Sequence, residues 1–163
     1  MAKQRIAVSF ALWGAVILAA GWLLYLTPVF IIESNQGIYK ILNAQEGKKF
    51  SLKFIHSVHL TPVVENFVIT GHKTFDLEST EYQSLGVGMP FSRQDGVFLS
   101  EGGKFVMKDM DREFKSIELM IYPDNKLTLT CEGKSEFLFE LPAGSLVKLK
   151  IDSCGNYFFH KYF

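Results

Sequence analysis

The sequence predicts a mainly β protein, an antiparallel β-sandwich or small β-barrel that follows one N-terminal transmembrane helix. Residues 6–26, IAVSFALWGAVILAAGWLLYL, form an apolar run without a charge, and the chain after Pro28 consists of short alternating strands separated by turn residues. About ten strands with one apolar face each need a second layer to cover those faces, which two packed sheets or a closed barrel provide. We therefore divide the chain into an anchor, residues 1–28, and a β domain, residues 29–163.

The apolar run predicts a membrane anchor. About 20 apolar residues at the rise of a helix match the ~30 Å hydrocarbon layer of a bilayer. Lys3 and Arg5 precede the run, and the nearest charge beyond it is Glu33. This excess of positive charge places the N-terminus in the cytoplasm and the bulk of the chain outside, as a single-pass protein of the cytoplasmic membrane. A signal peptide cleaved at residues 19–21 and a buried helix are the alternatives. Cleavage would leave residues 22–26 as an exposed apolar tail, and a buried helix would show a polar face, so we favour the uncleaved anchor.

Composition restricts the class of partner and the state of the two cysteines. The 163 residues have a formal net charge of +0. They contain no long run of one sign, which argues against a nucleic-acid partner and leaves small molecules or proteins. Cys131 falls on the apolar side of a predicted strand, whereas Cys154 falls in a turn-like stretch. A disulfide is permitted outside the cytoplasm, but these positions favour two separate thiols.

Apolar alternation and turn residues give the predicted strands in chain order. The early strands cover residues 38–42, 51–58, 63–70, 74–82, 96–100 and 104–107. A three-stranded meander follows over residues 117–121, 127–130 and 137–141, then a strand over 147–151 and a last aromatic strand near 157–163. Residues 108–115, KDMDREFK, are expected to form a helical turn or a surface loop. They lack the glycine and the terminal glutamate of an EF-hand calcium loop.

Residues 54–67 predict a hairpin that brings a histidine and a carboxylate together. With Leu60 and Thr61 at its tip, the apolar residues of both strands match on one face, and this register sets His56 opposite Glu65. Directly opposed Cβ atoms lie ~4.5–5.5 Å apart, which lets an imidazole donate a hydrogen bond to a carboxylate.

Three interpretations of this pair remain open. It can fix the hairpin as a buried hydrogen-bonded pair, it can line a pocket in which His56 and Ser57 or His59 meet a polar ligand, or it can bind a metal together with His59. His56 and His59 lie three residues apart and would point to opposite faces of a continuous strand, which disfavours a metal. Ser57 and His56 are adjacent and point apart, which disfavours a hydrolase. The sequence therefore predicts no metal, no cofactor and no catalytic residue.

Residues 86–90, GVGMP, form the second unusual stretch. Gly86 and Gly88, followed by Pro90, permit a tight turn or a bulge where the backbone can approach a ligand closely. The stretch lacks the strand and helix that flank a dinucleotide-binding glycine motif, and a plain loop between the halves of the sandwich is the alternative. If the loop folds over the hairpin, the two make one ligand-binding site. Its candidate residues are His56, Ser57, Glu65, Gly86, Gly88, Met89 and Pro90.

At these stretches the chain resembles the bacterial family called domain of unknown function 1850. The matching segments are residues 54–58 (FIHSV), 62–67 (PVVENF) and 86–90 (GVGMP), in that order. The family carries no established activity, so the resemblance implies no catalytic residue. It implies instead an association with tripartite, ATP-independent transporters that use a TAXI-class extracytoplasmic solute receptor.

We therefore expect a non-enzymatic, membrane-anchored accessory protein of a TRAP/TAXI-type solute transport system. It is expected to bind a small ligand or a transporter component, such as a transporter subunit or the solute receptor. An envelope protein with a structural or scaffold role and no ligand is the alternative. A metal-dependent hydrolase has less support.

Overall fold

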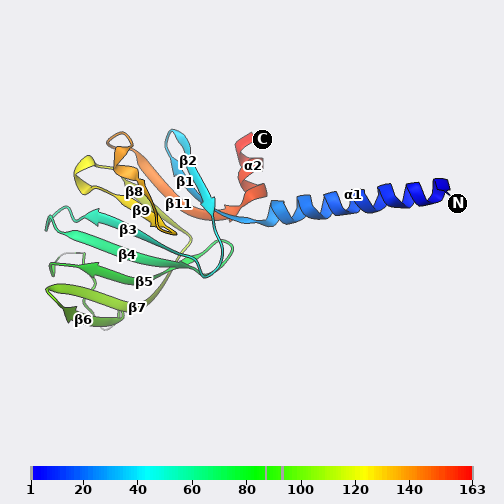
Figure 1. Cartoon of the computed structure of the whole chain (residues 1–163). Coiled ribbons are helices and arrows are strands. Elements are labelled where there is room, and N and C mark those ends of the chain that lie inside the picture. The colour runs from blue at the N-terminus through cyan, green and yellow to red at the C-terminus, as the bar shows by residue number, and fades with distance from the viewer. Residues whose placement is uncertain (1, 87, 93, 163) are drawn as a thin grey trace.

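Two antiparallel sheets make up most of the structure, a computed structural model that describes residues 2–86, 88–92 and 94–162. The smaller sheet has the strand order β2 (Gly37–Asn43), β1 (Pro28–Ser34), β11 (Leu146–Ser153) and β8 (Ser116–Met120). The larger has the order β10 (Lys134–Phe137), β9 (Thr128–Cys131), β3 (Lys49–Ile55), β4 (Pro62–Ile69), β5 (Phe75–Tyr82), β7 (Lys104–Phe114) and β6 (Val97–Glu101). The prediction of a mainly β, antiparallel fold is confirmed, and the two sheets are arranged as in a sandwich (Figure 1).

Two helices lie outside the sheets. Helix α1 (Ala2–Leu26) projects away from the sandwich, and α2 (Cys154–Tyr162) lies beside the point where α1 meets it (Figure 1). Within the described residues, we find no helix with both the length and the apolar character needed to cross a membrane. Two 3-10 turns, η1 (Pro123–Asn125) and η2 (Leu138–Glu140), complete the described elements.

The core lies between the two sheets, because successive strand residues point to opposite faces and the inward positions are apolar. Phe30 of β1 and Phe50 of β3 meet across the interface with ring centroids 4.8 Å apart. Phe50 also stacks on Phe67 of β4 at 4.9 Å. These three rings are almost fully buried, and aromatic contacts of this kind add to the stability gained from area burial.

Residues 108–114 belong to strand β7, which ends at Phe114, so the prediction of a helical turn or surface loop over 108–115 is wrong. The pairing of β7 with β5 contains a register shift. At this bulge Asp109 and Asp111 adopt left-handed backbone conformations, with φ of 53° and 44°, while Met110 between them is buried. A bulged strand with charged residues on its open side has the composition of a loop. For this reason the alternation of apolar residues did not reveal the strand here.

The three-stranded meander predicted for residues 117–141 is also wrong. Strand β8 pairs with β11 in the smaller sheet, whereas β9 pairs with β3 in the larger one. The turn η1 lies between β8 and β9 and carries the chain from one sheet to the other, and η2 replaces the predicted strand after residue 137. Alternation shows which residues face a core, but it does not show which sheet a strand joins.

The aromatic segment near the C-terminus forms helix α2, which corrects the predicted strand near residues 157–163; Phe163 lies outside the described residues. Ser153 caps the helix, because its Oγ accepts a hydrogen bond from the backbone N–H of Asn156 at 3.1 Å. Cys154 at the start of α2 and Cys131 in β9 are both free thiols.

Candidate functional site

The loop of the β3–β4 hairpin covers residues 56–61 and lies nearer to β3 than predicted, so the predicted pairing of His56 with Glu65 is wrong. Leu52, four residues before His56, lies opposite Glu65. The loop closes through hydrogen bonds from His56 N–H to Thr61 O and from Leu60 N–H to His56 O, each 2.9 Å long. A shift by an even number of residues keeps the same side chains on the inner face of the sheet, so the apolar match could not reveal it.

Glu65 lies in β4 among side chains of the sandwich interior. Its neighbours across the sheet are Leu52 of β3 and Thr80 of β5, and both are buried. This burial raises the pKa of the Glu65 carboxyl above its ordinary value, and the charge of Arg112 opposes the rise. Glu65 does not line either of the two grooves described below.

His56 begins the hairpin loop, residues 56–61, and its ring is held by the backbone of that loop. Nδ1 accepts hydrogen bonds from the N–H groups of Val58, at 3.2 Å, and His59, at 3.3 Å. The turn also sets the rings of His56 and His59 face to face, with centroids 5.2 Å apart. The two histidines that a continuous strand would separate therefore lie together, because the loop bends between them.

The glycine loop, residues 84–90, packs against His59; its Val87 lies outside the described residues. Ser84 Oγ lies 3.3 Å from His59 Nδ1. A Cβ added to Gly86 would lie 1.9 Å from His59 Nε2, and one on Gly88 would lie 4.0 Å from His56 Nε2. Only a residue without a side chain leaves room for the His59 ring at position 86. The glycine loop therefore packs against the hairpin loop, which is one of the alternatives that the sequence leaves open.

The contact between the two loops contains an unusual polar atom. Among the described residues, His59 Nε2 is buried and has no hydrogen-bond partner. A buried polar atom without a partner costs about 1–3 kcal/mol, and native structures keep few of them. The junction of the hairpin loop and the glycine loop is therefore a candidate functional feature.

The end of the glycine loop is tied to strand β5. Met89 N–H donates to Gly86 O at 3.1 Å, and the hydroxyl of the buried Tyr82 donates to Pro90 O. Met89 and Pro90, two of the predicted site residues, thus take part in the contacts that shape the loop.

A groove of about 640 Å³, here called the hairpin groove, opens on one side of the hairpin loop. Strand β3 and the hairpin loop form one wall, and β8 and the segment around η1 form the other. Most of the lining is apolar, supplied by Phe54, Leu60, Leu119, Met120, Tyr122 and Leu127. Polar groups come from His56, Ser57, Asp124 and Asn125.

A second groove, also of about 640 Å³, opens beside the glycine loop. It is lined by Leu85, Gly86, Gly88, Phe91 and Phe98. The predicted site residues are therefore divided: His56 and Ser57 line the hairpin groove, whereas Gly86 and Gly88 line the second groove. No group of three or more His, Cys, Asp or Glu side chains that could hold a metal ion occurs in the described part of the chain.

Sequence reasoning missed one whole wall of the hairpin groove. The sequence predicts Leu119 and Met120 in the first strand of the meander and places Tyr122 between that strand and its turn; their place in the groove follows from the pairing of β8 with β11. Tyr122 stands before Pro123 at a turn and is 54 % exposed. An aromatic residue at a predicted turn was the one sequence signal that this wall offered.

Comparison with known proteins finds a family model that matches the chain. A family model described as a domain of unknown function (DUF1850) matches residues 50–138, more than half of the 163-residue chain. The matched span contains the hairpin loop, the glycine loop and both walls of the hairpin groove. No curated protein and no solved structure matches the chain.

Proposed function

The chain belongs to the DUF1850 family, and from this premise we propose that its β domain is a non-enzymatic binding module that accompanies a solute transport system of the TRAP/TAXI type. The module receives a small ligand or a transporter component, a subunit or the solute receptor, in the hairpin groove. Residues 1–28 hold it at the cytoplasmic membrane, and the β domain lies outside the cytoplasm.

The chemistry of the hairpin groove is the observation that carries this proposal. Ligand-binding grooves are lined mainly by apolar and aromatic side chains, with a few polar groups that orient the ligand. The hairpin groove has this composition, with Phe54 and Tyr122 among its apolar residues and His56 and Asn125 among its polar ones. It therefore suits an occupant with an apolar body and a group that forms hydrogen bonds.

The contacts of the histidines favour binding over catalysis. His56 Nδ1 accepts two backbone hydrogen bonds, and His59 Nδ1 lies beside Ser84 Oγ. These contacts fix the shape of the two loops. A binding module needs such a fixed shape, whereas a catalytic histidine has to donate a proton to a reacting group or accept one from it.

The position of the loops supports access by an exported ligand or receptor. Strands β3 and β5, which lead into the hairpin loop and the glycine loop, point away from α1 (Figure 1). The charge-free run of residues 6–26 and the basic residues before it support a membrane anchor. With α1 in the membrane, the hairpin groove lies at the far end of the β domain.

A pair of aspartate substitutions in the hairpin loop tests the proposal. Leu60 lines the hairpin groove and is 75 % exposed, whereas Val58 is 66 % exposed and does not line it. Leu60 has a φ of 52°, a conformation that aspartate tolerates well, so Leu60→Asp should fold. The tagged full chain is purified in mild detergent from cells that carry the transporter, and the transporter subunits and solute uptake are measured.

We expect Leu60→Asp to lose both the transporter subunits and solute uptake, because a charge in an apolar groove opposes binding. Val58→Asp adds the same charge to the same loop and should retain both. If Leu60→Asp behaves like Val58→Asp, the hairpin groove is not the binding site. If the unsubstituted chain never recovers transporter subunits and its loss does not change uptake, the transport role is wrong.

A further inference from the structure

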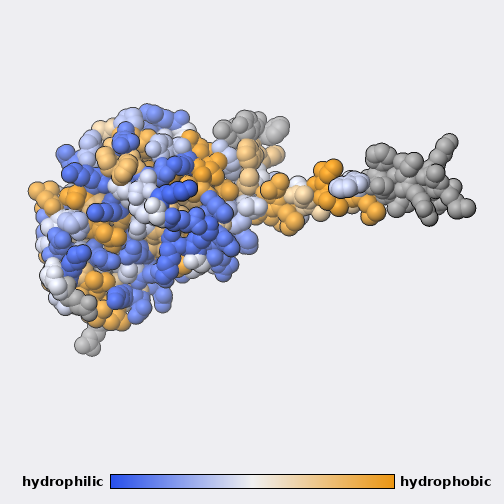
Figure 2. Space-filling model, in the orientation of Figure 1, coloured by the Kyte–Doolittle hydropathy of each residue, from blue (hydrophilic) through white to orange (hydrophobic). Residues whose placement is uncertain are grey.

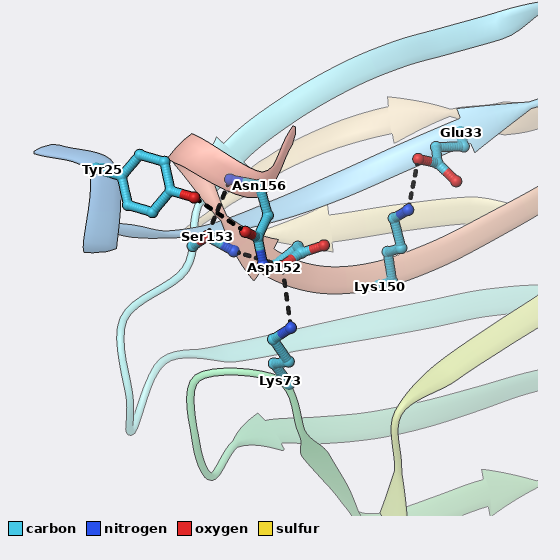
Figure 3. A network of polar contacts seen from close by, with 7 residues as sticks. All are labelled: Tyr25, Glu33, Lys73, Lys150, Asp152, Ser153 and Asn156. Atoms are coloured by element: carbon cyan, nitrogen blue, oxygen red, sulfur yellow. Dashed lines mark hydrogen bonds and ion pairs between the residues drawn. The ribbon is translucent and has the colours of Figure 1, made fainter. Parts of the chain in front are cut away.

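Helix α2 is attached to the end of α1 by close contacts, of which Figure 3 shows the one between Tyr25 and Asn156. Cys154 N–H donates to Thr27 O at 2.8 Å, and the Tyr25 hydroxyl donates to Asn156 Oδ1 at 3.3 Å. A Cβ on Gly155 would lie 1.9 Å from a carbon of the Tyr25 ring, so only glycine lets the two helices approach this closely. The start of α2 therefore has a fixed position beside the last turn of α1.

A polar network fixes the same junction to the sandwich (Figure 3). Asp152 Oδ1 accepts hydrogen bonds from Ser153 N–H at 2.8 Å and Asn156 Nδ2 at 3.2 Å, and Lys73 Nζ lies 3.4 Å away. Burial would raise the pKa of Asp152, but these hydrogen bonds and the Lys73 charge outweigh it and lower the pKa. The carboxylate thus joins β11, α2 and the β4–β5 loop.

Aromatic side chains gather at this junction. Trp22 and Tyr25 of α1 are 64 % and 43 % exposed, and Phe158 and Phe159 of α2 are 50 % and 59 % exposed. Tyr157, between them and the sandwich, is buried. Hydrophobic residues predominate on the coloured part of α1 and continue onto the start of α2, whereas much of the sandwich surface in this view is hydrophilic (Figure 2).

From this geometry we propose that α2 lies in the membrane–water interface and is a second contact between the β domain and the bilayer. The inference rests on the proposed membrane anchoring of α1. Trp and Tyr side chains prefer the interfacial level of a bilayer, and Trp22 and Tyr25 mark that level on α1. Because α2 is fixed to Tyr25 and turns away from the axis of α1 (Figure 1), its exposed Phe158 and Phe159 lie at the same level. A helix with such an apolar face binds the boundary between headgroups and acyl chains.

The proposed contact has a structural consequence. A single spanning helix leaves a domain free to tilt and rotate above the membrane, whereas a second helix fixed at the surface restricts both motions. The hairpin groove is then held on the side of the β domain that faces away from the bilayer.

Fluorescence quenching by brominated lipid tests the inference on the full chain. Trp13 and Trp22 are the two tryptophans of the sequence, so substitutions can leave one reporter at a time. Trp13→Phe keeps Trp22 as the reporter of α1. Trp13→Phe with Trp22→Phe and Phe159→Trp reports on α2, and the same background with Phe98→Trp reports on β6. Each protein is reconstituted into phosphatidylcholine and phosphatidylglycerol vesicles with or without phosphatidylcholine brominated in the acyl chain.

We expect brominated lipid to quench Trp22 and the tryptophan at position 159 to a similar extent, and to leave the tryptophan at position 98 unquenched. Quenching of Trp22 without quenching at 159 overturns the inference but leaves the anchor intact. Absence of quenching at Trp22 overturns the anchor, and the inference with it. If Phe159→Trp does not fold, Phe158→Trp replaces it. In the background that reports on position 159, Gly155→Val should reduce quenching there, because it separates α2 from Tyr25.

Discussion

Gly86 packs against the ring of His59, and this contact predicts a strong coupling between two substitutions. Gly86→Ala places a methyl group where the His59 ring lies, so we predict a loss of about 1–3 kcal/mol in the free energy of unfolding, as for other overpacked sites. His59→Ala removes the ring and should rescue most of that loss in the double variant.

Urea unfolding of the two single variants and the double variant measures the coupling. We expect a coupling energy of about 0.5–3 kcal/mol, the range for residues in contact. Gly71→Ala is the matched control, because a Cβ there meets one atom, Thr74 Oγ1, at 3.1 Å. Additive effects of Gly86→Ala and His59→Ala would show that the two loops do not touch at this point.

Glu65 predicts a pH dependence of stability. Burial raises its pKa in the folded state, with Arg112 opposing the rise, so the folded chain holds this proton more tightly than the unfolded chain. The contribution of Glu65 to the free energy of unfolding is therefore complete below its ordinary pKa of 4.5. It is lost as the pH rises through the pKa that Glu65 has in the folded state.

Glu65→Gln, which carries no charge at any pH, should be more stable than the unsubstituted chain at neutral pH, and the difference should shrink below pH 4.5. Urea unfolding across this pH range measures the difference in the free energy of unfolding. Glu46 is exposed, so Glu46→Gln is the control. A Glu65→Gln variant that is less stable at neutral pH would contradict this placement of Glu65, and would instead agree with a buried ion pair.

At the scale of elements, the register of the β3–β4 hairpin is open to a direct chemical test. Lys53 lies opposite Val64, whereas the register predicted from the sequence places Ser57 opposite Val64. Directly opposed strand residues fall within the Cα separation that a disulfide spans. In a background with both natural cysteines replaced by serine, we predict that Lys53→Cys with Val64→Cys oxidises readily to a disulfide. Ser57→Cys with Val64→Cys should remain mostly reduced, and the reverse result would restore the predicted register.

The elements that the sequence predicted well are those whose alternation is regular and whose turns are short. Strands β2, β4 and β5 lie within one or two residues of the predicted ranges. Strand β7 was truncated because its bulge interrupts the alternation. Helix α2 was missed because its start signal is one capping serine, Ser153, inside a stretch with turn composition.

At the scale of the whole molecule, the sequence predicted the antiparallel β class, but it gave the convergence of the two unusual loops only as one alternative and did not give the partners within the site. His56 and Gly88 do come together, because both loops lie at one end of the sandwich. Glu65 does not join them, since the register of a hairpin can shift by an even number of residues without exposing the apolar face. The β8 wall of the hairpin groove depends on pairing across distant strands, which local patterns do not encode.

If residues 1–28 hold the chain in the membrane as proposed, the hairpin groove lies at the end of the β domain that faces away from the membrane. Its walls come from both sheets, β3 of the larger and β8 of the smaller, and α1 and α2 meet the sandwich at the other end (Figure 1). In the proposed function, this separation lets the module reach a soluble ligand or a receptor without moving its anchor.

Photocrosslinking in cells that carry the transporter tests this central claim most directly. Benzoylphenylalanine is placed at Leu60 or at Tyr122, which line the hairpin groove from opposite walls, or at Tyr39 on edge strand β2, which is exposed but does not line it. We predict that positions 60 and 122 form the same discrete adduct with a transporter component or a bound small molecule, and that position 39 forms none. Adducts that are absent from both groove positions, or equal at all three positions, would contradict it.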